Sequence, residues 1–150
     1  MGPSTCPACG ESGPVGLRGP SEVALATVAA ALEQRPVVDC PSGHERTPTS
    51  ARPATDEALA RAIPRARQRR LRREVCERCG APLTMPVRRT ARPVSVEASD
   101  LPVLTVQIDL PMTRCPGCGR DQVPGRSQPD LDAVASALFA DDGPDDSSSR

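Results

Sequence analysis

Seven cysteines and a single histidine are the residues of this chain best suited to metal chemistry, and they fall into four pairs. The pairs are Cys6 with Cys9, Cys40 with His44, Cys76 with Cys79, and Cys115 with Cys118. A closed structural zinc site takes four thiolate or imidazole ligands, and one Cys-x-x-Cys turn supplies two of them. The sequence therefore predicts two Zn²⁺ ions, with no ligand left over.

The residues beside these ligands favour metal-binding turns. Gly10, Gly80 and Gly119 each follow the second cysteine of a pair, where the turn needs a positive φ that glycine tolerates. Prolines follow the first ligand of three pairs, and their fixed φ suits a stiff turn. Ordinary thiols or disulfides are the alternative, but Cys-x-x-Cys pairs repeated with a histidine are typical of zinc sites.

Four pairs can join in neighbouring or in crossed order. The order of ligand types is that of a RING domain, in which crossing depends on a cysteine two or three residues after the histidine. Here residues 45–75 separate His44 from Cys76, and closing the loops between neighbouring pairs costs less chain entropy. We therefore reject a RING ligase and assign the first four ligands to site one and the last four to site two.

Composition leaves little material for an aromatic core. The 150 residues include no Trp and no Tyr, and Phe139 is the one aromatic residue. Binding at a structural zinc supplies about 10–16 kcal/mol of apparent free energy at neutral pH, and this becomes folding energy. We therefore expect metal binding to supply the stability that a large hydrophobic core would otherwise give. The expected fold is small, α+β and metal-stabilised, with two tandem zinc-ribbon-like modules and short helices.

The formal net charge is zero, and arginine supplies all the basic side chains. Residues 1–6 lack the features of a signal peptide, and the mainly apolar run at 23–32 is too short to span a bilayer. We therefore expect a cytoplasmic protein without a membrane segment, because thiols stay reduced and free to bind metal in the cytosol.

Each predicted module has a ligand pair, a long intervening segment, a second ligand pair and then a helical segment. Equivalent pairs of the two modules are about 70 residues apart. Residues 1–54 form the first module. Ser21 caps a helix over residues 22–34, Pro36 stops it, and residues 47–55 are a loop.

The second module covers residues 76–140. Apolar residues alternate with polar ones over Leu104–Leu110, which predicts a strand with one apolar face; Val94 and Val96 belong to its partner. A third strand is possible near residues 83–88. A C-terminal helix follows Asp130 as its cap, and residues 141–150 form a disordered acidic tail. The helix's apolar face consists of Leu131, Val134, Ala135, Leu138 and Phe139.

Residues 55–75 are predicted to form an arginine-rich connector, helical from Asp56 to Glu74 and kinked at Pro64. Guanidinium groups along it could contact phosphates, or could simply be solvated; the acidic tail could neutralise them. Single-strand readers stack bases on aromatic side chains, so duplex or structured RNA is the expected nucleic acid. The candidate contacts are Arg65, Arg69, Arg70, Arg72 and Arg73, with Arg61 and Arg67 in the same run.

From Glu74 onward, the order Cys76-Glu-Arg-Cys79-Gly80, a strand pair, Cys115-Pro-Gly-Cys118-Gly119 and a short helix resembles the YgiT-type zinc-finger proteins. That family includes the zinc domain of MqsA-like antitoxins. The resemblance covers about half of the chain and implies a zinc-bound β-ribbon that holds a protein partner. The DNA-binding helix-turn-helix domain that follows the ribbon in the antitoxins has no counterpart here, so operator binding is not implied.

The two predicted metal sites take every Cys and the only His as ligands, which leaves none of them for nucleophilic catalysis and argues against an enzyme. The two Cys-x-x-Cys-Gly turns of site two also resemble the iron-binding turns of rubredoxins, so an electron carrier is a lesser alternative. We expect a regulatory or adaptor protein that binds a protein partner. The edge of the 104–110 hairpin could accept a partner strand, or the C-terminal helix could cover this edge. A nucleic-acid-binding factor is the second possibility.

Overall fold

An antiparallel sheet forms the centre of the computed structural model, which describes residues 3–69, 73–84 and 87–140. Its main strands lie in the order β10–β11–β5–β4. Val94 pairs with Val106 and Val96 with Leu104, as expected from the sequence. The fold is thus α+β with mostly antiparallel pairing. The strand bounds are β4 Ser21–Ala24, β5 Ala29–Leu32, β10 Val87–Val96 and β11 Leu104–Arg114.

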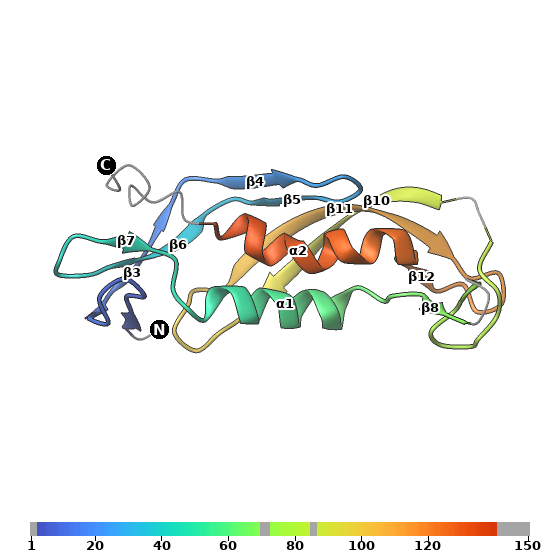
Figure 1. Cartoon of the computed structure of the whole chain (residues 1–150), viewed down its shortest axis with the longest axis horizontal. Helices are drawn as coiled ribbons and strands as arrows, with labels where there is room; N and C mark the ends of the chain where they lie inside the picture. Colours follow the sequence, from blue (N-terminus) through green and yellow to red (C-terminus); the bar gives the residue numbers. More distant parts are fainter. Residues whose placement is uncertain (1–2, 70–72, 85–86, 141–150) are drawn as a thin grey trace.

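Helices α1 (Ala51–Ala62) and α2 (Gln128–Leu138) lie side by side on one face of this sheet (Figure 1). One aliphatic core fills the space between them and the strands, and Phe139 within it is 0% exposed. The predicted apolar face of α2 is confirmed, because its four helical members and Phe139 are all buried. Neither helix has the length and apolar character needed to cross a membrane, among the residues that the structure describes.

The start of α2 corrects one detail of the sequence interpretation. Ser127, not Asp130, occupies the N-cap position. Asp130 lies in the first turn, where its carboxylate accepts hydrogen bonds from the backbone N–H of Thr27 at 2.8 Å and from the Thr27 hydroxyl at 2.6 Å. The side chain therefore ties α2 to the β4–β5 turn.

The helix predicted over residues 22–34 is wrong. This segment forms β4, a tight turn and β5, and it continues toward β6 (Arg35–Asp39). Val28, Ala30 and Leu32 are buried at a spacing of two residues, a strand period that coexists with the helical spacing in this apolar run. Pairing of β5 with both β4 and β11 satisfies the backbone, and this tertiary gain outweighs local helix propensity.

The connector helix is also wrong in its bounds. Helix α1 begins within the predicted loop and ends at Ala62, because Ile63 before Pro64 adopts an extended conformation (φ −118°, ψ 107°). Beyond it, β8 (Arg67–Gln68) pairs with β9 (Glu74–Val75). Of the possible strand near 83–88, residues 87–88 belong to β10, whereas residues 85–86 lie outside the described part of the chain.

Both halves of the chain repeat one order of elements: a cysteine turn, a long hairpin, a second turn, a short strand and a helix. In the first half the hairpin joins β3 (Val15–Arg18) and β4 to β5 and β6; in the second it is β10–β11. The equivalent strands β5 and β11 run antiparallel, so the two halves share one sheet and point in opposite directions. Their cysteine turns therefore lie at opposite ends of an elongated molecule (Figure 1).

Candidate metal centres

Site one brings together Cys6, Cys9, Cys40 and His44 at one end of the molecule, where their ligand atoms all lie within 4.8 Å of one another. The Sγ atoms of Cys9 and Cys40 are 3.6 Å apart, and Nδ1 of His44 is 3.3 Å from Sγ of Cys40. Tetrahedral zinc with Zn–S bonds near 2.3 Å would place two sulfurs about 3.8 Å apart. The group thus has the size of a metal site, and its imidazole enters through Nδ1.

Site two brings together Cys76, Cys79, Cys115 and Cys118 at the other end, again with all four ligand atoms within 4.8 Å. Sγ of Cys76 is 3.6 Å from that of Cys118, and Sγ of Cys79 is 3.4 Å from that of Cys115. All seven cysteines are free thiols, not disulfides. The structure therefore groups neighbouring pairs, as predicted, into two clusters that could each hold a metal ion.

The turns that carry the ligands have the predicted backbone. Gly10, Gly80 and Gly119 have φ between 77° and 79°, and Gly43 before the histidine has φ 87°. In site two the turn aims N–H groups at sulfur: Gly117 N–H donates to Sγ of Cys115 at 3.3 Å. These donors stabilise thiolates, which are the form that binds metal.

Gln122 is a site residue that sequence reasoning missed. Its buried side chain donates from Nε2 to Sγ of Cys76 at 3.0 Å, and its Oε1 accepts the N–H of Glu77 at 2.7 Å. Burial alone would raise the pKa of the Cys76 thiol, but the N–H groups of Cys79 and Arg78, the Cys118 thiol and this amide lower that pKa to about 6. No spacing rule marks the residue, because the contact arises when β12 (Asp121–Gln122) pairs with β11.

We expect Gln122→Leu to weaken metal binding at site two by roughly 10- to 100-fold, the usual effect of losing a hydrogen bond to a ligand. The apolar side chain removes a donor from the Cys76 sulfur and leaves the Glu77 N–H without its acceptor. Competition against a chromophoric chelator would measure the affinity. Gln107→Leu, at an exposed position of β11, is the matched control, and equal affinities for the two variants would contradict a role for Gln122.

The predicted nucleic-acid contacts do not share a helix face. Arg65 pairs with Asp132 at 2.6 Å, and Arg69 and Arg73 are exposed on the β8–β9 hairpin, where Arg69 N–H donates to the Arg73 carbonyl at 2.7 Å. Arg70 and Arg72 lie outside the described residues. The described arginines beyond α1 therefore lie next to site two and not on a separate connector helix.

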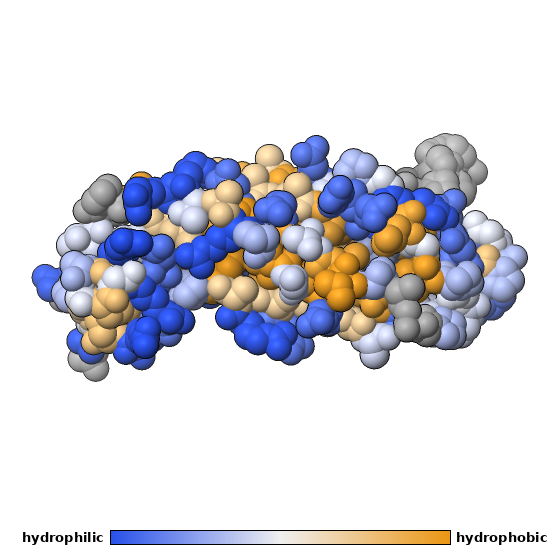
Figure 2. All heavy atoms as spheres, turned by 180° about the vertical axis from the view of Figure 1, so that it is seen from behind, coloured by the Kyte–Doolittle hydropathy of each residue, from blue (hydrophilic) through white to orange (hydrophobic). Residues whose placement is uncertain are grey.

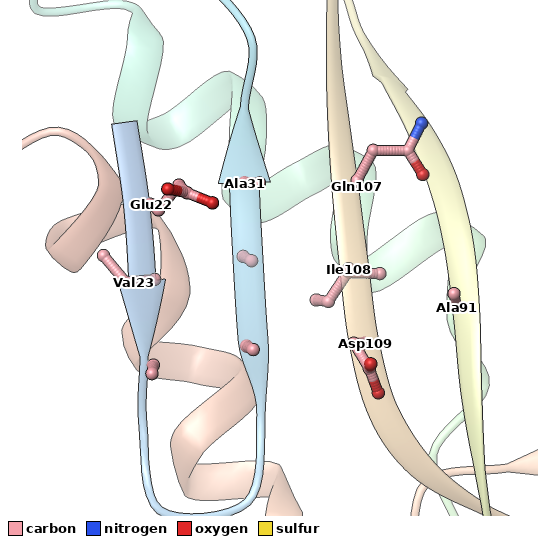
Figure 3. Close-up of a pocket in the computed structure, with 10 residues that line it drawn as sticks. Glu22, Val23, Ala31, Ala91, Gln107, Ile108 and Asp109 are labelled. Carbon is pink, nitrogen blue, oxygen red and sulfur yellow. The ribbon is translucent and has the colours of Figure 1, made fainter. Parts of the chain in front are cut away.

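The strand edge that could accept a partner strand is occupied by the chain itself. Strand β11 is paired on one side with β10 and on the other with β5, so the outer strands of the central sheet are β4 and β10. On the face of this sheet away from the helices, apolar residues gather over the middle (Figure 2). A shallow hollow of about 440 Å³ lies there, bordered by Glu22, Ala31, Ala91, Gln107 and Asp109 (Figure 3).

Comparison with known proteins gave no match to a family model, to a curated protein or to a solved structure. The resemblance to YgiT-type zinc fingers therefore stays a prediction. The chemistry of the two ligand groups and the charges around them are the features from which function can be inferred.

Proposed function

We propose that this chain is a non-enzymatic, cytoplasmic zinc-binding protein that acts as a regulatory or adaptor component. The observation that carries the proposal is the sorting of every thiol and the only imidazole into two four-donor groups. A catalytic zinc keeps one position open for water, and nucleophilic catalysis needs a free Cys or a comparable activated group. Four protein ligands at each site are instead the arrangement of a structural zinc.

Zinc is favoured over redox iron by the ligands and their surroundings. Site one includes an imidazole, which suits zinc better than rubredoxin-type iron. At site two, the side chain bonded to the ligand sulfur is the amide of Gln122, and the chain's one aromatic residue belongs to the central core. Thiolates accept either metal, so metal analysis separates the two functions.

The open face of the central sheet supports a protein partner as the first class to consider. Its alanines allow close approach of another backbone, and Glu22, Gln107 and Asp109 border the hollow with polar groups. An adaptor works by presenting such a surface on a rigid frame. Metal ions bound at the two ends of the molecule would stabilise the position of this sheet.

Untagged protein purified under reducing conditions should contain two zinc ions per chain by elemental analysis. Each site offers four ligands, and structural sites of this kind bind zinc with apparent free energies of about 10–16 kcal/mol. Iron in place of zinc would reopen electron transfer. One metal per chain would show that one of the two groups is not a structural site.

A further inference from the structure

The two ends of the molecule have the same frame but different charges. Around site one, residues 3–18 and 39–50 include the acidic residues Glu11, Asp39 and Glu45 and the basic residues Arg18 and Arg46. Around site two, the acidic residues of 73–84 and 114–126 are Glu74, Glu77 and Asp121, whereas arginines are abundant. Because the frame is shared, the excess of arginine is not a requirement of the fold.

Several arginines near site two serve internal ion pairs. Arg120 pairs with Glu77 at 2.6 Å, and both Arg92 and Arg114 pair with Asp121, at 3.6 Å and 3.3 Å. These contacts use the carboxylates of Glu77 and Asp121, and the Glu74 carboxylate accepts the N–H of Gly125. The acidic groups of this end are therefore already engaged.

A second set of arginines near site two takes no part in these ion pairs, and we call this set the basic end. All of its members are exposed, and their guanidinium groups make no ion pair or hydrogen bond within the described part of the chain. The basic end consists of Arg67, Arg69, Arg73, Arg78, Arg88 and Arg126.

The backbone holds the basic end in place on site two. Arg67 pairs with Val75 directly before ligand Cys76, and Arg78 lies inside the Cys76–Cys79 turn. Ala66 N–H donates to the Val123 carbonyl at 3.0 Å, which ties the hairpin to the segment after Cys118. Arg88 lines a hollow of about 310 Å³ together with Arg114 and Thr84, so β10 brings it to the same end.

We propose that the basic end binds the phosphate backbone of double-helical nucleic acid. Guanidinium groups without carboxylate partners, carried on a backbone that is held in place, match phosphates, and release of counterions from the nucleic acid drives such binding. Stacking of bases on Phe, Tyr or Trp, which single-strand binding uses, is not available, because the chain has no Trp or Tyr and Phe139 is 0% exposed. This second surface goes beyond the proposed zinc-dependent adaptor function and would let it join a protein to a nucleic acid.

Fluorescence anisotropy with a labelled DNA duplex, an RNA stem-loop, a single strand and polyglutamate tests the proposal. We expect the two double-helical ligands to bind at 50 mM salt and to lose about 500-fold in affinity at 200 mM, as about five phosphate contacts predict. Preference between them tells DNA from RNA. Absence of duplex binding at 50 mM, or tighter binding of polyglutamate than of either duplex, would overturn the proposal; the latter result would assign the surface to an acidic protein.

Paired substitutions locate the surface. Arg67→Gln with Arg73→Gln should reduce the salt-induced loss about tenfold, since two phosphate contacts contribute about 1.8 to the slope of log affinity against log salt. Arg35→Gln with Arg52→Gln removes the same charge from the first half of the chain and should leave the slope unchanged. Equal effects of the two pairs would contradict a localised site. Metal content and circular dichroism establish folding first, and Arg78→Gln with Arg88→Gln serves if the first pair unfolds.

Discussion

Cys76→Ser should lower the metal content from two ions to one and remove hydrogen-exchange protection at one end of the molecule only. The Cys76 thiol is fully buried and is held by the Gln122 amide and the Arg78 N–H. A serine hydroxyl is not ionised near neutral pH and cannot replace a thiolate ligand. We expect protection to be lost over residues 73–84 and 115–123.

The size of this effect follows from comparing two free energies. A structural zinc contributes about 10–16 kcal/mol, whereas whole domains are stable by about 5–15 kcal/mol. The strands β8, β9 and β12 have two residues each, so we expect their pairing to be lost without the metal. Strands β10 and β11 share ten paired positions and face the central core, so their protection should persist.

Cys6→Ser is the matched variant at the other end. It should also leave one metal, but the loss of protection should move to β1 (Ser4–Thr5), β2 (Ser12–Gly13) and β7 (Glu45–Arg46). Elemental analysis and hydrogen exchange followed by mass spectrometry measure both variants. Loss of both metals in either variant, or the same pattern of exchange in both, would contradict two independent sites at opposite ends.

The ligand groups could be predicted from the sequence because each depends on local geometry. A Cys-x-x-Cys turn places two sulfurs together whatever surrounds it, and loop length then favours neighbouring pairs. Strand β11 was predictable for a similar reason, since Leu104, Val106, Ile108 and Leu110 alternate with polar residues in a sheet that is buried on one face.

The joining of the two halves could not be predicted in the same way. Residues 22–34 have apolar side chains at both helical and strand spacing, and the choice depends on β11, some 75 residues away. The partner strand supplies backbone hydrogen bonds that no local pattern reveals. The same contact covers the edge of β11 that could otherwise accept a partner strand.

Pro64 changes the path of the chain more than the predicted kink would. A proline inside a helical pattern kinks or ends the helix, and here it ends α1 with Ile63 already extended. Of the arginines beyond it, Arg67, Arg69 and Arg73 lie on a hairpin next to site two. This placement, and not a helix face, brings Arg67 and Arg73 to the end that also carries Arg78.

The absence of Trp and Tyr predicts that metal binding takes the place of a large hydrophobic core. The structure nevertheless has one continuous, mainly aliphatic core, to which both halves of the chain contribute residues. Phe139 belongs to this core. The ring is 0% exposed, the Phe139 N–H donates to the Ala135 carbonyl at 3.1 Å, and Arg52 donates to the Phe139 carbonyl at 3.2 Å. These hydrogen bonds hold the backbone of Phe139 at the end of α2 and join it to Arg52 of α1, while its ring belongs to the core.

We expect Phe139→Ala to lower the free energy of unfolding by about 3–5 kcal/mol, the usual cost of removing a buried aromatic ring. Val103→Ala is the control, because Val103 is 64% exposed and such surface changes stay within about 0.5 kcal/mol. Urea unfolding of the zinc-loaded proteins at equal free zinc gives both values. If the two variants unfold at the same urea concentration, the metal sites alone determine global stability; if they differ as expected, the core contributes independently, and the rigidity that the adaptor function requires comes from both.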